Sequence, residues 1–124
     1  MVDIKPKIFK KIKSILQEFE SATLKGHGTD TKYEMSGTKD VVILGREVKG
    51  MYFAASMIKK GFVGFYYMPI YCAPKLISDV PDNLKKCLKG KTCFHIKKDD
   101  EEIYKSIKAL LKKGKAFYKK QGWI

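Results

Sequence analysis

The chain has 124 residues, which is enough for one domain with a hydrophobic core of its own. Its hydrophobic fraction of 44% and its aromatic content of 12% exclude a disordered chain, and no apolar run approaches the roughly 20 residues that a membrane span needs. The net charge of +13 indicates an affinity for polyanions, although only Arg46 among the 26 basic residues is an arginine.

The first segment is predicted to be a helix. Its apolar residues recur at spacings of three and four, which places them on one helical stripe. Pro6 lies in the first turn, where its missing N–H has no helical partner. The stripe consists of Ile4, Ile8, Ile12, Ile15, Leu16 and Phe19.

The next segment, 21–40, is predicted to be a polar loop around a short strand at 32–36, because it contains Gly26, Gly28 and Gly37. A brief β-branched run follows at 41–44, and a turn is expected at 45–47.

The clearest strand signal is an aromatic hairpin. The runs 51–58 and 62–68 are separated by Lys59-Lys60-Gly61, and Gly61 can adopt the positive φ of a tight turn. Neither run alternates cleanly between apolar and polar residues. We therefore expect central strands that are covered on both faces.

The second half predicts a short helix within 76–88, ended by Gly90, and then a strand at 92–96. This strand should direct Cys93 and His95 to one side. A long closing helix follows, with Asp99 as its expected N-cap and Glu102 completing a capping box. Its apolar stripe is Ile103, Ile107, Leu110, Leu111, Phe117 and Tyr118.

These elements predict a single α+β domain that covers residues 1–124. We expect an antiparallel sheet of about four or five strands. An N-terminal helix, a short middle helix and a long C-terminal helix should pack on it.

A lysine stripe on the closing helix is the first candidate site. Its spacing of three and four residues indicates a docking face for phosphates or an acidic partner, or simply the solvated face of an amphipathic helix. The stripe consists of Lys105, Lys108, Lys112, Lys115 and Lys119.

The aromatic residues of the hairpin region are the second candidate. They can line a pocket for a small apolar ligand, with phenolic hydroxyls as polar handles, or they can form the core and a homodimer interface. The candidate pocket residues are Tyr52, Phe65, Tyr67 and Tyr71.

Catalytic and metal motifs are not evident. Cys93 and His95, even with His27, Cys72 and Cys87, lack the short ligand spacing of zinc motifs. No G-x-S-x-G sequence and no phosphate-cradling glycine loop occur. We expect neither a cofactor nor an enzyme.

The expected location is the cytoplasm. The N-terminal residues 1–6 lack the apolar core of a secretory signal. Three cysteines, an odd number without a C-x-x-C pair, indicate free thiols rather than a disulfide framework.

Two segments, 53–69 and 90–97, resemble the central hairpin and the "GK-S/T-C-x-x-F/I-K" strand of the YdhG-like domain of unknown function, which is common in bacteria. The resemblance covers roughly residues 35–122. It implies a compact antiparallel sheet with packed helices. Some members are described as frataxin-like intracellular iron chaperones.

Our leading hypothesis is a non-enzymatic binding domain that contacts an anionic macromolecule through lysines. The first alternative is the iron- or metal-handling role that the resemblance implies. The second is small-ligand binding in the aromatic pocket.

Overall fold

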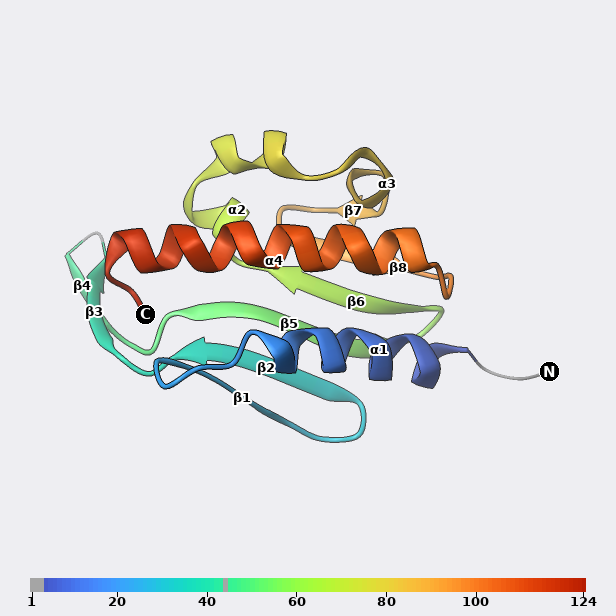
Figure 1. Ribbon diagram of the computed structural model, residues 1–124, viewed down its shortest axis with the longest axis horizontal. Coiled ribbons are helices and arrows are strands. Elements are labelled where there is room, and N and C mark those ends of the chain that lie inside the picture. Colours follow the sequence, from blue (N-terminus) through green and yellow to red (C-terminus); the bar gives the residue numbers. More distant parts are fainter. Residues whose placement is uncertain (1–3, 44) are drawn as a thin grey trace.

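The computed structural model describes residues 4–43 and 45–124 and shows two layers, a sheet and a pair of helices (Figure 1). The antiparallel sheet has six strands in the order β1-β2-β5-β6-β8-β7. Helices α1 (Lys5–Glu18) and α4 (Glu101–Gln121) lie side by side on one face of it. The α+β prediction is confirmed, and the sheet is larger than the four or five strands expected.

Both long helices form where the apolar periodicity predicts them. In α1, Ile8, Ile12 and Leu16 are fully buried and pack on β5 and β6, whereas Ile4 is exposed. The first three residues of the chain lie outside the described part. In α4 the buried stripe also includes Tyr104 and Gly114.

The cap of α4 lies one residue later than expected. Asp100, not Asp99, is the N-cap, and its Oδ1 accepts the amide N–H of Glu102 at 2.9 Å. The Asp99 carboxylate instead accepts the Tyr104 hydroxyl at 2.7 Å and pairs with Lys7 at 2.9 Å. Both adjacent carboxylates therefore have a structural role.

The predicted hairpin is confirmed as β5 (Tyr52–Lys59) and β6 (Phe62–Tyr67). Gly61 has a φ of +87°, which favours glycine in the tight turn. The strand β2 (Lys32–Gly37) pairs with β5, and an irregularity after Met35 shifts the register by one residue. Phe53 is the additional residue, and it is buried against Tyr67 and Tyr118.

Two further hairpins occupy the predicted polar loop 21–40 and the β-branched run that follows it. The strand expected at 32–36 is confirmed as β2, whereas Arg46 and Glu47 of the expected turn at 45–47 belong to a strand. The strand β1 (Leu24–Gly28) pairs with β2, although its sequence LKGHG has no strand signal. The strands β3 (Asp40–Ile43) and β4 (Arg46–Lys49) form a separate two-stranded sheet. Leu44, the last residue of the predicted run 41–44, lies outside the described residues.

The short helix predicted within 76–88 is confirmed, but it has only one turn. The connection contains α2 (Pro69–Cys72), a 3-10 helix η1 (Pro74–Asp79), α3 (Asp82–Lys85) and the short strand β7 (Leu88–Lys89). Proline opens α2 and η1, and Pro81 separates η1 from α3, so each helix of this connection stays short. The strand β8 (Cys93–Ile96) then forms as expected.

Among the described residues, helices lie on one face of the sheet only (Figure 1). On β6, Val63, Phe65 and Tyr67 face α1 and α4 and are buried, whereas Phe62 and Tyr66 alternate to the other side and are half-buried. The expectation that both faces of the central strands are covered is therefore met only in part: on the other side Ala55 is fully buried, but Phe62 and Tyr66 are half-buried. We use "open face" for the side of the sheet that carries Glu34, Met57, Phe62, Tyr66 and His95, as the strand registers require.

Candidate functional site

The predicted lysine stripe lies on α4 as expected, but much of it is engaged in contacts within the protein. Lys105 pairs with Glu102 at 3.4 Å, and Lys108 pairs with Glu18 of α1 at 3.1 Å. The half-buried Lys115 donates to the backbone carbonyl of Phe19 at 2.9 Å. Within the described residues, Lys112 and Lys119 have no ion pair.

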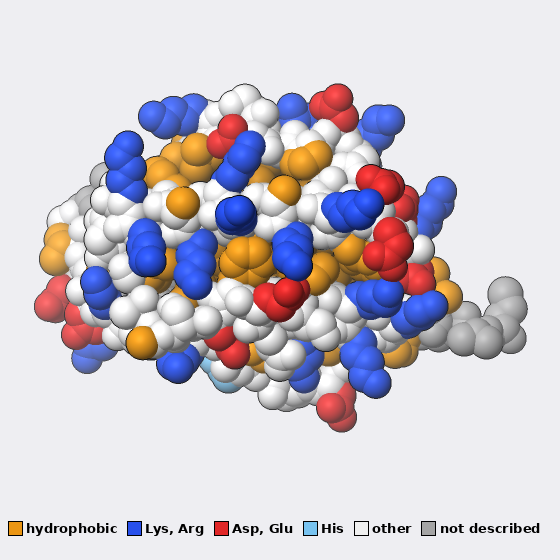
Figure 2. All heavy atoms as spheres, viewed as in Figure 1, with side chains coloured by type: hydrophobic (Ala, Val, Ile, Leu, Met, Phe, Trp, Pro, Cys, Tyr) orange, Lys and Arg blue, Asp and Glu red, His pale blue; other side chains and the backbone are white. Residues whose placement is uncertain are grey.

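The view onto the helices shows the same mixture of charges. Lysine side chains are scattered over this face, with acidic side chains and apolar surface between them (Figure 2). Lys113, next to the stripe, also approaches Asp79 at 3.9 Å. The α4 stripe therefore has fewer uncompensated charges than its sequence indicates.

The predicted aromatic pocket is not assembled. Phe65 and Tyr67 are 0% and 1% exposed in the core between the sheet and the helices. The Tyr67 hydroxyl is used there, because it donates to the backbone carbonyl of Leu110 at 2.8 Å. Tyr52 lies on the open face, opposite to Phe65. The four residues cannot line one cavity, because the pleat sends them to opposite sides of the sheet.

Tyr71 lies apart from the other three. Its side chain is exposed on α2, and it borders a pocket of about 570 Å³ together with Ile70, Pro74, Ile77 and Lys91. The Lys91 ammonium lies 5.8 Å from the centre of the Tyr71 ring. This aromatic residue thus belongs to the α2–η1 connection rather than to the sheet.

The open face has aromatic residues of its own. The rings of Phe62 and His95 are stacked, with their centres 3.7 Å apart and an angle of 9° between their planes. Both side chains are half-buried. Because β6 and β8 are adjacent, this pair joins two side chains from neighbouring strands.

Tyr66 lies on the same face, two residues beyond Gly64. A Cβ at Gly64 would lie 2.8 Å from the Tyr66 ring, so the ring lies across the glycine backbone. Burial, followed by the neighbouring Cys93 thiol, raises the pKa of Tyr66 to about 12. Burial, followed by the charge of Glu34 and by Tyr66, raises the pKa of Tyr52 as well.

The open face is bordered by lysines. The strand registers place Lys25 and Lys32 on its β1–β2 side, Lys59 beside Phe62, and Lys89 opposite Cys93. Glu34 is the one acidic residue that the six described strands direct to this face, and it pairs with Lys32 at 2.9 Å. A positive charge therefore surrounds half-buried aromatic rings.

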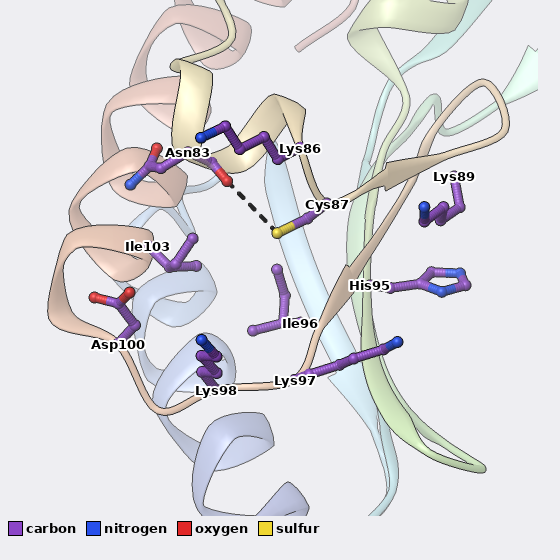
Figure 3. A pocket seen from close by; sticks show the side chains of 10 residues that line it. All are labelled: Asn83, Lys86, Cys87, Lys89, His95, Ile96, Lys97, Lys98, Asp100 and Ile103. Carbon is purple, nitrogen blue, oxygen red and sulfur yellow. Dashed lines mark hydrogen bonds between the residues drawn. The ribbon is translucent and has the colours of Figure 1, made fainter.

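A pocket of about 540 Å³ lies at the β7–β8 edge of the sheet. Lys89, His95 and Lys97 project to one side of the two strands, and Cys87, Ile96 and Ile103 lie on the other side (Figure 3). The pocket thus continues the open face around the edge of the sheet. Its basic residues are Lys86, Lys89, Lys97 and Lys98.

The described residues do not bring together three or more His, Cys, Asp or Glu side chains that could hold a metal ion. Cys93 and His95 do share the open face, as predicted, but His95 is stacked on Phe62. Cys72, Cys87 and Cys93 are free and half-buried. Among the described helices, none is both long and apolar enough to cross a bilayer.

Sequence reasoning missed the open face because the hairpin strands read as apolar on both sides. One signal was present. Of the residues between Lys59 and Tyr66 that point to this face, all except Gly64 are lysine, phenylalanine or tyrosine. Such a pattern is compatible with a half-exposed face.

No family model matches the chain, and neither does any curated protein or solved structure. The YdhG-like family and the iron-handling role that it implies stay predictions from the sequence.

Proposed function

We propose that this protein is a non-enzymatic binding domain for an anionic macromolecule, and that the open face is its contact surface. The observation that carries the proposal is a sheet face without a helix on which lysines surround a single, already paired acidic residue. A net charge of +13 supplies a long-range attraction for polyanions. The proposal keeps the cytoplasmic location expected from the sequence.

The open face supports this function better than α4 does. Among the described residues, Lys25, Lys59, Lys89 and Lys97 have no ion pair, and Lys32 has one. On α4, Lys105 and Lys108 are neutralised by acidic neighbours. A lysine that is already paired gains less from a phosphate, because the existing partner must first be displaced.

The use of lysine indicates the kind of recognition. A lysine ammonium is a flexible point charge, whereas bidentate contacts with base edges or phosphates favour arginine. With Arg46 as the single arginine of the chain, we expect contacts to phosphate groups that depend little on sequence.

The test compares two variants that each remove four positive charges. The open-face variant changes Lys25, Lys59, Lys89 and Lys97 to Gln, and the α4 variant changes Lys105, Lys108, Lys112 and Lys119 to Gln. Binding to heparin and to a labelled oligonucleotide is measured by fluorescence anisotropy between 50 and 300 mM salt, concentrations of about the range where phosphate contacts are strongly salt-dependent.

The open-face variant should lose affinity at low salt. Its slope of log affinity against log salt should fall by about 3 to 4, since each lost phosphate contact contributes roughly 0.7 to 0.9. The α4 variant should bind nearly as the wild type does. A loss confined to the α4 variant would move the contact surface to α4, and an absence of polyanion binding by the wild type would refute the function.

A further inference from the structure

We infer that the open face binds single-stranded nucleic acid, with bases stacked on the Phe62–His95 pair and on Tyr66 while the surrounding lysines contact phosphates. This inference rests on the proposed function, and it names the class of polyanion. A surface that recognised charge alone would bind a duplex, heparin or an acidic protein equally well. The aromatic rings make the distinction, because a flat unpaired base is the ligand that complements both features.

The Phe62–His95 stack is the first element of the argument. Two parallel rings 3.7 Å apart already have the spacing and the orientation of stacked bases. Neither ring is fully buried, and no helix in the described residues covers them. A base stacked on the far side of either ring would extend the existing stack.

Tyr66 provides a second surface on the same strand. Phe62 and Tyr66 are four residues apart on β6, so their Cα atoms are separated by about 13 Å at roughly 3.3 Å per residue. Gly64, between them, leaves room for the Tyr66 ring to lie across the backbone. Because Tyr66 is only half-buried, it offers a second aromatic contact on this face.

The lysines are placed on both sides of these rings. Lys25 and Lys32 belong to the β1–β2 side of the sheet, and Lys89 and Lys97 belong to the β7–β8 edge. The rings lie on β6 and β8, between the two sets. A single strand crossing the sheet would therefore meet lysine, then aromatic surface, then lysine again.

A duplex satisfies this surface less well. Its bases are stacked on each other and hidden from a flat sheet, so it can use the lysines but not the rings. The same holds for heparin, which has no bases. The predicted signature is therefore a preference for single strands that depends on the rings, together with a general affinity for polyanions that depends on the lysines.

The experiment uses three probes: a fluorescein-labelled 12-nucleotide oligo-dT, a 12-base-pair duplex and heparin. Phe62→Leu and Tyr66→Leu each keep an apolar side chain but remove the aromatic face. Tyr71→Leu is the matched control, because Tyr71 is an exposed tyrosine that lies on α2 and outside the open face. Circular dichroism and thermal unfolding establish that each variant is folded.

We expect Phe62→Leu and Tyr66→Leu each to weaken oligo-dT binding roughly 5- to 100-fold, as the loss of one stacked base would. Heparin and duplex binding should change less than about twofold, and Tyr71→Leu should behave as the wild type. If oligo-dT binding survives both leucine substitutions while the open-face lysine variant loses it, the inference is wrong and the proposed function stands. If no polyanion binds the wild type, both fail.

Two further measurements do not depend on the leucine variants. Ultraviolet cross-linking of the wild type to oligo-dU, followed by mass spectrometry of the peptides, should place the cross-links on β6 and β8. Cross-links on α4 instead would overturn the inference. Sedimentation velocity tests the competing occupant, since a stable homodimer that protects Phe62 and Tyr66 from solvent would also overturn it.

Discussion

The ring of Tyr67 on β6 lies directly against Gly114 of α4. The Tyr67 hydroxyl donates to the carbonyl of Leu110, one helical turn before Gly114, at 2.8 Å. A Cβ at position 114 would overlap the hydroxyl and lie 2.8 Å from the ring carbon that bears it. The glycine therefore allows α4 to approach Tyr67 of β6 closely, at the cost of a weaker helix.

This contact predicts the effect of Gly114→Ala. In an exposed helix the substitution stabilises by about 1 kcal/mol, but here it should destabilise the protein by about 1–3 kcal/mol through overpacking. Urea denaturation followed by circular dichroism measures the difference. In the Tyr67→Phe background the penalty should shrink, because the nearest overlapping atom is gone; an equal penalty in both backgrounds would show that the tyrosine is not responsible.

Ser56 predicts a stabilising substitution. Its side chain is fully buried on the helix side of β5, opposite Phe65, and its hydroxyl has no hydrogen-bond partner within the described residues. Ser56→Ala should raise the free energy of unfolding by about 1 kcal/mol, because an unpaired hydroxyl is removed from an apolar site.

Ser106 is the matched control for this prediction. It is also buried, but its hydroxyl donates to the Asn83 side chain at 2.7 Å. Ser106→Ala should lower the free energy of unfolding by about 1 kcal/mol. The two serines should thus respond with opposite signs in the same denaturation assay, and a loss of stability in both would contradict the account of Ser56.

The position of the α4 cap predicts a difference between two substitutions at one residue. Asp100→Ala removes the acceptor for the Glu102 amide and should cost about 1 kcal/mol, whereas Asp100→Asn keeps an oxygen acceptor and should cost less. Amide hydrogen exchange at Glu102 should accelerate in the alanine variant alone. Unchanged exchange at Glu102 would mean that Asp100 does not cap the helix.

Buried tyrosines predict a loss of stability at alkaline pH. Burial raises the pKa of Tyr67 and Tyr118, and it raises that of Tyr33, also through its bond to Glu20, to about 12. The unfolded chain releases these protons near pH 10, whereas the folded protein retains them. Their contribution to stability is therefore complete below pH 10 and is lost progressively as the pH rises through the folded values.

Tyr118→Phe isolates one of these groups. Its hydroxyl donates to the backbone carbonyl of Tyr52 at 2.6 Å, and its ring is 0% exposed. Above pH 10.5, a value about half a unit above the ordinary tyrosine pKa, the free energy of unfolding of the variant should fall less steeply, by up to about 1.4 kcal/mol per pH unit for one proton. Tyr71→Phe, which changes an exposed tyrosine, should keep the wild-type slope.

Local sequence patterns determined the elements that each contain their own signal. The stripe Ile8, Ile12 and Leu16 predicts α1, and the Ile103–Tyr118 stripe predicts α4. In each case the apolar residues recur at helical spacing within a single segment of the chain. The β5–β6 hairpin was equally readable, since Gly61 and the two flanking runs are adjacent in the chain. The lysines of α4 were located correctly for the same reason.

Tertiary contacts decided what no local pattern encodes. The strand β1, with the sequence LKGHG, is a strand because β2 offers it hydrogen-bond partners. Tyr52 and Phe65 were grouped as one pocket, yet the pairing of the strands sends them to opposite faces. Likewise, Lys108 looks like a free charge in the sequence until α1 brings Glu18 to it.

The candidate site likewise depends partly on local sequence and partly on tertiary packing. The sequence by itself determined a strongly basic α+β domain, because net charge and helical periodicity are sums and repeats over neighbouring residues. Which lysines stay unpaired, and which aromatic rings remain uncovered, depended on where α1 and α4 pack. Because both helices pack on the same side of the sheet, Phe62, Tyr66 and His95 stay accessible on the other.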